Sequence, residues 1–230
     1  METNKRDRLL WWLMYVLIGL AGVVFSWLVL LKLLYRLMAR LGKPMPDPAS
    51  VNWLVDNPIR RLYTQRILDR IGIRPGETVL EVGPGPGTFT IEAARRVGPE
   101  GRLIVVEMLP RMAAQVEQRA REAGLTNVET YVASAYGLPM PIEDESVDRA
   151  FVITVLHEVP HQSRALDQLN RVLKPGGMLS ITEEFLDPDY AFPFETVQLV
   201  EAAGFSRERF FGNFWLYTLN FGKSSGIAYD

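Results

Sequence analysis

An apolar run that ends on three alternating glycines constrains the fold of this chain more than any other feature. Residues 79–90 read VLEVGPGPGTFT, and a helix-compatible segment follows. A strand that leads into a helix through a loop without bulky side chains lets a ligand approach the main chain and lie against helix N–H groups. Dinucleotide sites need their third glycine one position later, where Thr88 stands. The loop therefore favours a nucleoside ligand that lacks a pyrophosphate.

From residue 58 onward the chain alternates apolar, strand-like runs with amphipathic, helix-like ones. The predicted strands cover residues 78–82, 103–106, 128–132, 149–155, 178–182, 207–211 and 215–221. The predicted helices cover residues 58–71, 88–97, 110–123, 163–173 and 195–203. This alternation predicts an α/β fold with a doubly wound, Rossmann-like sheet that binds its ligand at the carboxyl ends of the strands.

Four motifs in this order resemble those of the class I S-adenosylmethionine-dependent methyltransferases. Glu81 stands two positions before Gly83, as in the family's motif Glu/Asp-x-Gly-x-Gly-x-Gly. A strand-like run ends in Glu107, which resembles the family's carboxylate that holds both ribose hydroxyls. One carboxylate can accept two hydrogen bonds from a vicinal diol. Residues 147–154 and 173–179 resemble the family's fourth strand and the turn into its fifth.

The resemblance implies a seven-stranded sheet with a terminal hairpin, S-adenosylmethionine as the cofactor, and methyl transfer as the activity. It implies that Glu81 contacts the cofactor's ammonium group. Met108 follows Glu107 and is a candidate to pack on the adenine, and an ordinary packing methionine is an equally good interpretation. Ser134 stands where many members carry an Asp that accepts a hydrogen bond from the adenine amino group, and a residue that only forms a turn is a comparable interpretation of Ser134. A hydroxyl accepts more weakly, so we expect adenine recognition to lean on the backbone near Ala135. The implied cofactor-binding residues are Glu81, Gly83, Gly85, Gly87, Glu107, Met108, Ser134, Ala135 and Thr154.

A histidine pattern follows the fourth predicted strand. Residues 157–161 spell His-Glu-x-x-His, the pattern of helical zinc proteases, but Pro160 stands inside it. Proline argues against the helix that would put both imidazoles on one face, so no metal site is predicted. In a loop at the carboxyl end of the strand, His157 is a candidate to touch the methyl acceptor or to act as a general base. A loop histidine that hydrogen-bonds the backbone is an equally good interpretation.

The first 43 residues predict a membrane anchor. Residues 9–31 contain Ser26 as their only clearly polar side chain, and as a helix they would span about 34 Å, enough for a hydrocarbon core of about 30 Å. A cleaved signal peptide is disfavoured, because the run is too long and no small-residue cleavage site follows. Lys32, Arg36 and Arg40 recur every four residues, which indicates either an amphipathic extension facing lipid phosphates or a snorkelling flank. Residues 44–57 then form a proline-rich linker to a methyltransferase domain over residues 58–230.

Charge and composition limit the partners. Residues 1–50 hold seven Lys/Arg and three Asp/Glu, and the net charge of the whole chain is −2, so a basic front precedes an acidic body. That balance gives no sign of a nucleic-acid partner. Cysteine is absent, which excludes disulfides and thiolate chemistry. Because S-adenosylmethionine is made in the cytosol, we expect a single-pass membrane protein whose catalytic domain faces the cytoplasm.

The acceptor is expected to be hydrophobic or a lipid. An anchored enzyme benefits from an acceptor that stays in the bilayer, and the aromatic residues of the segment 185–194 follow the fifth strand at the ligand edge. They either wall an apolar acceptor or pack under the terminal hairpin. Two other classes stay open: a membrane-tethered binding or scaffold protein without catalysis, and a methyltransferase for a soluble small molecule. The position of the third glycine argues against a nucleotide-dependent oxidoreductase.

Overall fold

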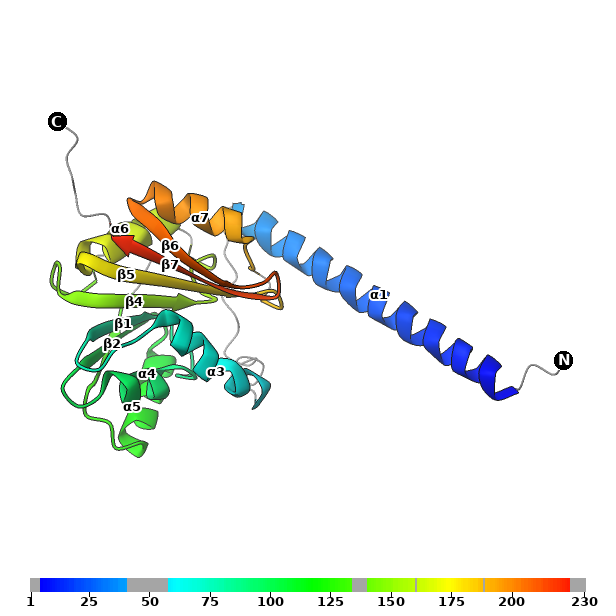
Figure 1. The fold of residues 1–230 in the computed structure, drawn as a ribbon, viewed down its shortest axis with the longest axis horizontal. Helices are drawn as coiled ribbons and strands as arrows, with labels where there is room; N and C mark the ends of the chain where they lie inside the picture. Colours follow the sequence, from blue (N-terminus) through cyan, green and yellow to red (C-terminus); the bar gives the residue numbers. More distant parts are fainter. Residues whose placement is uncertain (1–4, 41–57, 134–139, 160, 188, 224–230) are drawn as a thin grey trace.

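The computed structural model describes residues 5–40, 58–133, 140–159, 161–187 and 189–223. Seven strands form one sheet in the order β3-β2-β1-β4-β5-β7-β6 (Figure 1). The strands are β1 (Thr78–Val82), β2 (Arg102–Glu107), β3 (Val128–Val132), β4 (Val147–Ile153), β5 (Leu173–Glu184), β6 (Phe205–Gly212) and β7 (Leu216–Lys223). The helices are α1 (Lys5–Arg40), α3 (Pro58–Ile71), α4 (Thr90–Val97), α5 (Pro110–Glu122), α6 (Gln162–Val172) and α7 (Pro193–Ala202).

Strand direction confirms the predicted Rossmann-like methyltransferase fold. β1 lies between β2 and β4 and is parallel to both, and β3 and β5 continue the parallel sheet on either side. β7 is antiparallel to both β5 and β6. The order of the parallel strands reverses beside β1, so the loops that follow β1 and β4 leave a crevice between them.

Helices cover both faces of the sheet, because alternate strand residues point to opposite sides. Leu80 of β1 belongs to a core cluster that includes Leu166 of α6 and Val200 of α7. Its neighbour Val79 belongs to a second cluster with Ile67 of α3 and Val97 of α4. Two buried layers therefore fix β1 from both sides, and the loop after it starts from a rigid strand.

Strand β5 begins earlier than the sequence predicts. Leu173 already pairs with Val147, and the register then shifts so that Met178 pairs with Arg149. The turn residues between Leu173 and Met178 bulge out of the ladder, and Gly176 has a φ of 74° there. The Pro-Gly-Gly turn predicted to precede the strand therefore lies inside it.

The amino-terminal helix α1 projects away from the sheet as one long helix (Figure 1). Its segment Asp7–Leu34 is 28 residues long and apolar enough to cross a membrane, and none of its most apolar window is buried. The helix continues to Arg40, as the predicted extension requires. The predicted linker, residues 44–57, lies outside the described residues.

Candidate functional site

A cavity of about 160 Å³ lies at the carboxyl ends of β1, β2 and β4. The loops that follow these strands supply most of its wall, as expected for a doubly wound sheet. Six of the predicted cofactor-binding residues line it, namely Glu81, Gly83, Gly85, Glu107, Met108 and Thr154. Ser134 and Ala135 lie outside the described residues, although their neighbour Ala133 lines the same cavity.

Glu81 brings a buried carboxylate to the cavity. Its side chain is only 3% exposed, and its Oε2 has no hydrogen-bond partner among the residues that the structure describes. Burial, with a smaller contribution from the nearby carboxylate of Glu107, raises the pKa of Glu81 to about 8. A buried polar atom without a partner calls for an explanation, and a cationic ligand group in the cavity would provide one.

The glycine loop shows why two of its positions need glycine. Gly83 has a φ of 67°, and a Cβ there would lie 2.6 Å from Val155 Cγ2, so the loop packs tightly on the chain that follows β4. Gly85 has a φ of 55°, and a Cβ there would meet no atom of the described residues within 4 Å, so its backbone faces open space among them. A ligand can therefore reach the main chain at Gly85. Gly87 is not among the lining residues; a Cβ there would lie 3.3 Å from Val116 of α5.

Glu107 closes the other wall at the end of β2. The backbone N–H of Leu109 donates to its Oε1 over 2.8 Å, which fixes the carboxylate against the loop. Burial raises the pKa of Glu107, and the backbone N–H groups of Leu109 and Gly85 oppose that shift. The adjacent Met108 also lines the cavity. A carboxylate held in this way has acceptor capacity left for a ligand hydroxyl.

Arg60 is a residue of the cavity wall that the sequence pattern did not predict. It comes from α3, is 7% exposed, and lines the cavity. Its Nη2 lies 3.0 Å from Oε1 of Glu184 and donates to Thr154 Oγ1 over 3.1 Å. Nothing in the spacing of α3 separates Arg60 from the neighbouring arginine, so no sequence signal marks it.

Thr154 holds an uncommon backbone conformation. Its φ is 53°, in the left-handed region that a β-branched residue rarely adopts. Its N–H donates to the Thr182 carbonyl over 2.9 Å, and its hydroxyl accepts from Arg60. Such a conformation costs on the order of 1–3 kcal/mol and is typical of ligand sites. The conformation turns the chain away from the sheet at the cavity wall.

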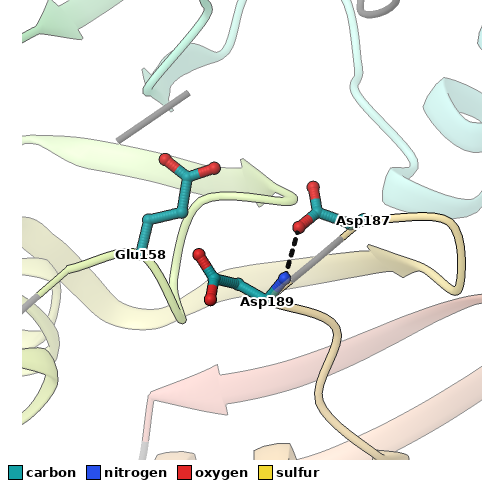
Figure 2. A group of neighbouring side chains, drawn as sticks. All are labelled: Glu158, Asp187 and Asp189. Carbon is teal, nitrogen blue, oxygen red and sulfur yellow. Dashed lines mark hydrogen bonds between the residues drawn. The ribbon is translucent and has the colours of Figure 1, made fainter. Parts of the chain in front are cut away.

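Three carboxylates gather beside the cavity, from the loops after β4 and β5 (Figure 2). Glu158, Asp187 and Asp189 each have an oxygen within 4.8 Å of the others, and the Asp189 N–H donates to Asp187 Oδ1. Glu158 and Asp187 also line the cavity. The cluster makes this side of the cavity negative, and its half-buried oxygens are of the kind that hold hard cations or accept protons.

His157 lies outside the cavity wall. Its Nε2 is 3.3 Å from Thr196 Oγ1 and 4.0 Å from Glu183 Oε1, and its Nδ1 is 3.3 Å from Gln162 Nε2. Glu183 is 1% exposed, and burial, followed by repulsion from Asp187 and other carboxylates, raises its pKa well above the usual value. Helix α6 begins at Gln162, after the His-Glu-x-x-His pattern, as the loop prediction requires.

The aromatic segment after β5 packs under the hairpin. Phe185 and Tyr190 are buried, and Phe185 lies 4.6 Å from Phe214 between ring centroids. None of the aromatic residues of the segment 185–194 lines the cavity; its aromatic walls are Phe89 and Phe151. Phe185 and Tyr190 therefore agree with the second interpretation, packing under the hairpin, whereas Phe194 is exposed.

Lys32 of α1 contacts the same segment. Its ammonium lies 4.8 Å from the ring centroid of Phe185 and 5.5 Å from that of Tyr190, and it donates to the Asp187 carbonyl. The four-residue spacing of Lys32, Arg36 and Arg40 predicts either an amphipathic extension facing lipid phosphates or a snorkelling flank. Aromatic faces and a carbonyl oxygen attract the ammonium instead, and Asp187 is a residue of the cavity wall.

Comparison with known proteins identifies the family of this chain. The methyltransferase domain family matches residues 73–202, more than half of the chain. The crystal structure of an S-adenosylmethionine-dependent methyltransferase from Aquifex aeolicus superposes with a TM-score of 0.71, covering 77% of this chain and 100% of that one at 24% identity. This chain belongs to the class I S-adenosylmethionine-dependent methyltransferase family.

Two relatives show how similar this chain is to curated proteins and how much of each protein the similarity covers. A 37.1 kDa protein of a Streptomyces fradiae transposon is 36% identical over 152 residues, which are 64% of this chain and 43% of that protein. The ubiquinone/menaquinone biosynthesis C-methyltransferase UbiE of Enterobacter sp. (strain 638) is 34% identical over 134 residues, 58% of this chain and 53% of that enzyme. The chain thus spans about half the length of the curated relatives that it matches.

Proposed function

We propose that this chain is an S-adenosylmethionine-dependent methyltransferase that acts at a membrane on a lipid-like or hydrophobic small-molecule acceptor. The observation that supports S-adenosylmethionine as the cofactor is the pair of carboxylates, Glu81 and Glu107, that face one cavity from neighbouring strand ends. Between them the main chain is open at Gly85. An amino acid joined to a nucleoside needs both features, an anion for its ammonium group and an acceptor for its ribose diol.

Each wall then has a role. Glu81 receives the ammonium group, Glu107 accepts from the ribose hydroxyls, and Met108 packs on the adenine. We propose that Ser134 and Ala135 contribute to the adenine site, and that Gly83 and Gly87 hold the loop in shape. The bound cofactor supplies a methyl group on a positively charged sulfonium. The protein must mainly align the acceptor and exclude water.

The proton acceptor, where the acceptor atom carries a proton, is Glu158 or Asp187. Both line the cavity, whereas His157 does not and is instead surrounded by Thr196, Gln162 and Glu183. We therefore assign His157 to positioning the loop after β4. This assignment replaces the general-base role that its place in the sequence suggested.

Two observations support a membrane-resident acceptor. Helix α1 is long and apolar enough to cross a bilayer, and its Lys32 contacts the segment that contributes Asp187 to the cavity. The name of the UbiE relative places that enzyme in quinone biosynthesis, which favours a hydrophobic ring as the acceptor here. We propose that α1 crosses the membrane once and that the domain lies on the cytoplasmic side, where the cofactor is made.

A titration of the full chain with S-adenosylmethionine tests the cofactor site. Glu107→Ala should weaken binding by about 1.5–3 kcal/mol, the cost of losing hydrogen bonds to a charged acceptor. Glu129→Ala is the matched control, because Glu129 lies on β3 and is not among the cavity residues. Equal affinity of the wild type and Glu107→Ala would remove Glu107 from the ribose site.

Methyl-labelled cofactor tests the acceptor. The full chain in bilayers of the host's total lipid extract should transfer label to a species that partitions with the lipids. Label that appears only in water-soluble molecules would overturn the lipid acceptor and leave the methyltransferase in place. Cofactor binding without any transfer of label, with soluble extract also supplied, would favour the scaffold alternative.

A further inference from the structure

The edge of the sheet beside the cavity carries an exposed apolar patch. We call it the edge patch, and its members are large apolar side chains between 44% and 72% exposed: Leu186, Phe194, Phe214 and Trp215. Leu186 directly precedes Asp187 of the cavity wall. Single exposed apolar residues need no explanation, but four gathered on two loops and the adjoining first turn of α7 mark an interaction site.

The chain topology explains why these residues meet. Leu186 follows β5, and Phe194 lies in the first turn of α7. Phe214 and Trp215 form the turn between β6 and β7, and because Leu216 pairs with Glu184, this turn lies at the carboxyl end of β5. The edge patch and the cavity therefore occupy the same edge of the sheet.

Buried rings hold the edge patch in place. Phe185 lies 4.6 Å from Phe214 and 4.9 Å from Trp215 between ring centroids. Phe192 stacks on Phe194 at 5.8 Å, and the hydroxyl of Tyr190 donates to the Phe214 carbonyl over 2.7 Å. Phe194, Phe214 and Trp215 thus stand on a packed aromatic layer, so little conformational entropy is lost when they bind a partner.

The contact of Lys32 with two buried rings indicates which partner the edge patch binds. Lys32 lies in the last turns of the apolar segment Asp7–Leu34, which places its ammonium at the level where a membrane span meets the head groups. The rings of Phe185 and Tyr190 lie within 4.8 and 5.5 Å of that ammonium and support the edge patch. The patch therefore lies at the same depth. Farther from this edge the exposed side chains of β6 become charged, at Arg207, Glu208 and Arg209.

We propose that the edge patch rests in the head-group layer of the bilayer that α1 crosses. Tryptophan is typical of the membrane interface, where its ring meets both hydrocarbon and water. Phenylalanine and leucine are typical of the apolar faces that rest at this boundary. This inference rests on the proposed membrane span and adds a second contact with the lipid. The contact of the edge patch with the bilayer would orient the cavity. Together, α1 and the edge patch prevent rotation of the domain about α1 and keep Asp187 facing the bilayer surface.

Site-directed labelling of the full chain tests the proposal, and the absence of cysteine makes each label unique. Phe194→Cys and Trp215→Cys carry an environment-sensitive fluorophore in nanodiscs of phosphatidylcholine and phosphatidylglycerol. Spin-labelled lipids should quench both labels several-fold more than aqueous iodide does. Glu100→Cys is the matched control: Glu100 is exposed just before β2, at the opposite edge of the sheet, and iodide should quench it more.

A label in the middle of α1 separates the two proposals. Leu17→Cys should be quenched by lipid if α1 crosses the bilayer. Quenching by lipid at Leu17→Cys together with water-exposed labels at Phe194→Cys and Trp215→Cys would overturn the edge patch alone. A water-exposed label at Leu17→Cys would overturn both proposals. The thermal unfolding midpoint of each labelled chain should stay within a few degrees of the wild type, because all the replaced side chains are exposed.

Discussion

At the scale of single residues, two glycines of one loop have different physical tasks, and matched substitutions should separate them. Gly85→Ala should leave the fold intact apart from about 1 kcal/mol of backbone strain at positive φ, but weaken cofactor binding, because the new methyl group stands where the ligand approaches. Gly83→Ala should lower the free energy of unfolding by more, since its Cβ clashes with Val155. Urea denaturation and cofactor titration of both variants check this. Equal losses of stability would show that the crowding at Gly83 is relieved without cost.

The raised pKa of Glu81 makes stability depend on pH. The folded state holds a proton up to about pH 8, whereas the unfolded chain releases it near pH 4.5. The free energy of unfolding of the ligand-free protein should therefore fall as pH rises from 5 to 8, by up to a few kcal/mol. Buried Glu183 adds to the same trend. Glu81→Gln should flatten the slope in urea denaturation at several pH values; an unchanged slope would mean that Glu81 is ionised in the fold.

At the scale of elements, one buried ion pair joins α3 to the ends of β4 and β5. Arg60 and Glu184 are 8% and 15% exposed in their side chains, and Tyr63 also donates to Glu184 over 3.0 Å. Arg60→Met should cost about 1–3 kcal/mol, because it leaves the half-buried carboxylate of Glu184 without its cation and with the Tyr63 hydroxyl as a donor. The double variant with Glu184→Met should regain most of that loss. Urea denaturation of the Arg60→Met, Glu184→Met and double variants measures these losses of stability. A free energy of unfolding for Arg60→Met within about 0.5 kcal/mol of the wild type, the size of a surface change, would contradict the prediction.

At the scale of the whole molecule, α1 and the domain should act together. Full-length chain should stay with membranes after alkaline carbonate extraction, because a span of this length is held by its apolar surface alone. Removal of residues 1–43 should lower turnover on vesicle-borne acceptor far more than it lowers cofactor affinity, since Glu81, Glu107 and the glycine loop stay in the domain. Release of the full chain by carbonate, or full activity of the shortened chain on lipid, would contradict a membrane-bound enzyme.

The sequence by itself determined the strand-loop-helix start of the fold and the strand ends that carry Glu81 and Glu107. These features depend on neighbours within about ten residues: apolar runs give strands, and glycines at positive φ give the loop. The bounds of β1, β3 and α3 agree with the predicted ranges for the same reason. The membrane-length helix is likewise a property of composition along one segment.

Only the tertiary structure decided which distant residues meet. Arg60 reaches Thr154 across 94 positions of sequence, and Lys32 reaches Asp187 across 155. No local pattern encodes such contacts, because their stability comes from burial and pairing that exist only once the sheet has assembled. The loop after β4 follows from a local pattern and was predicted. The position of His157 outside the cavity wall and the cluster of Glu158, Asp187 and Asp189 beside it were not predicted. Those outcomes depend on how the loops after β4 and β5 pack against each other in three dimensions.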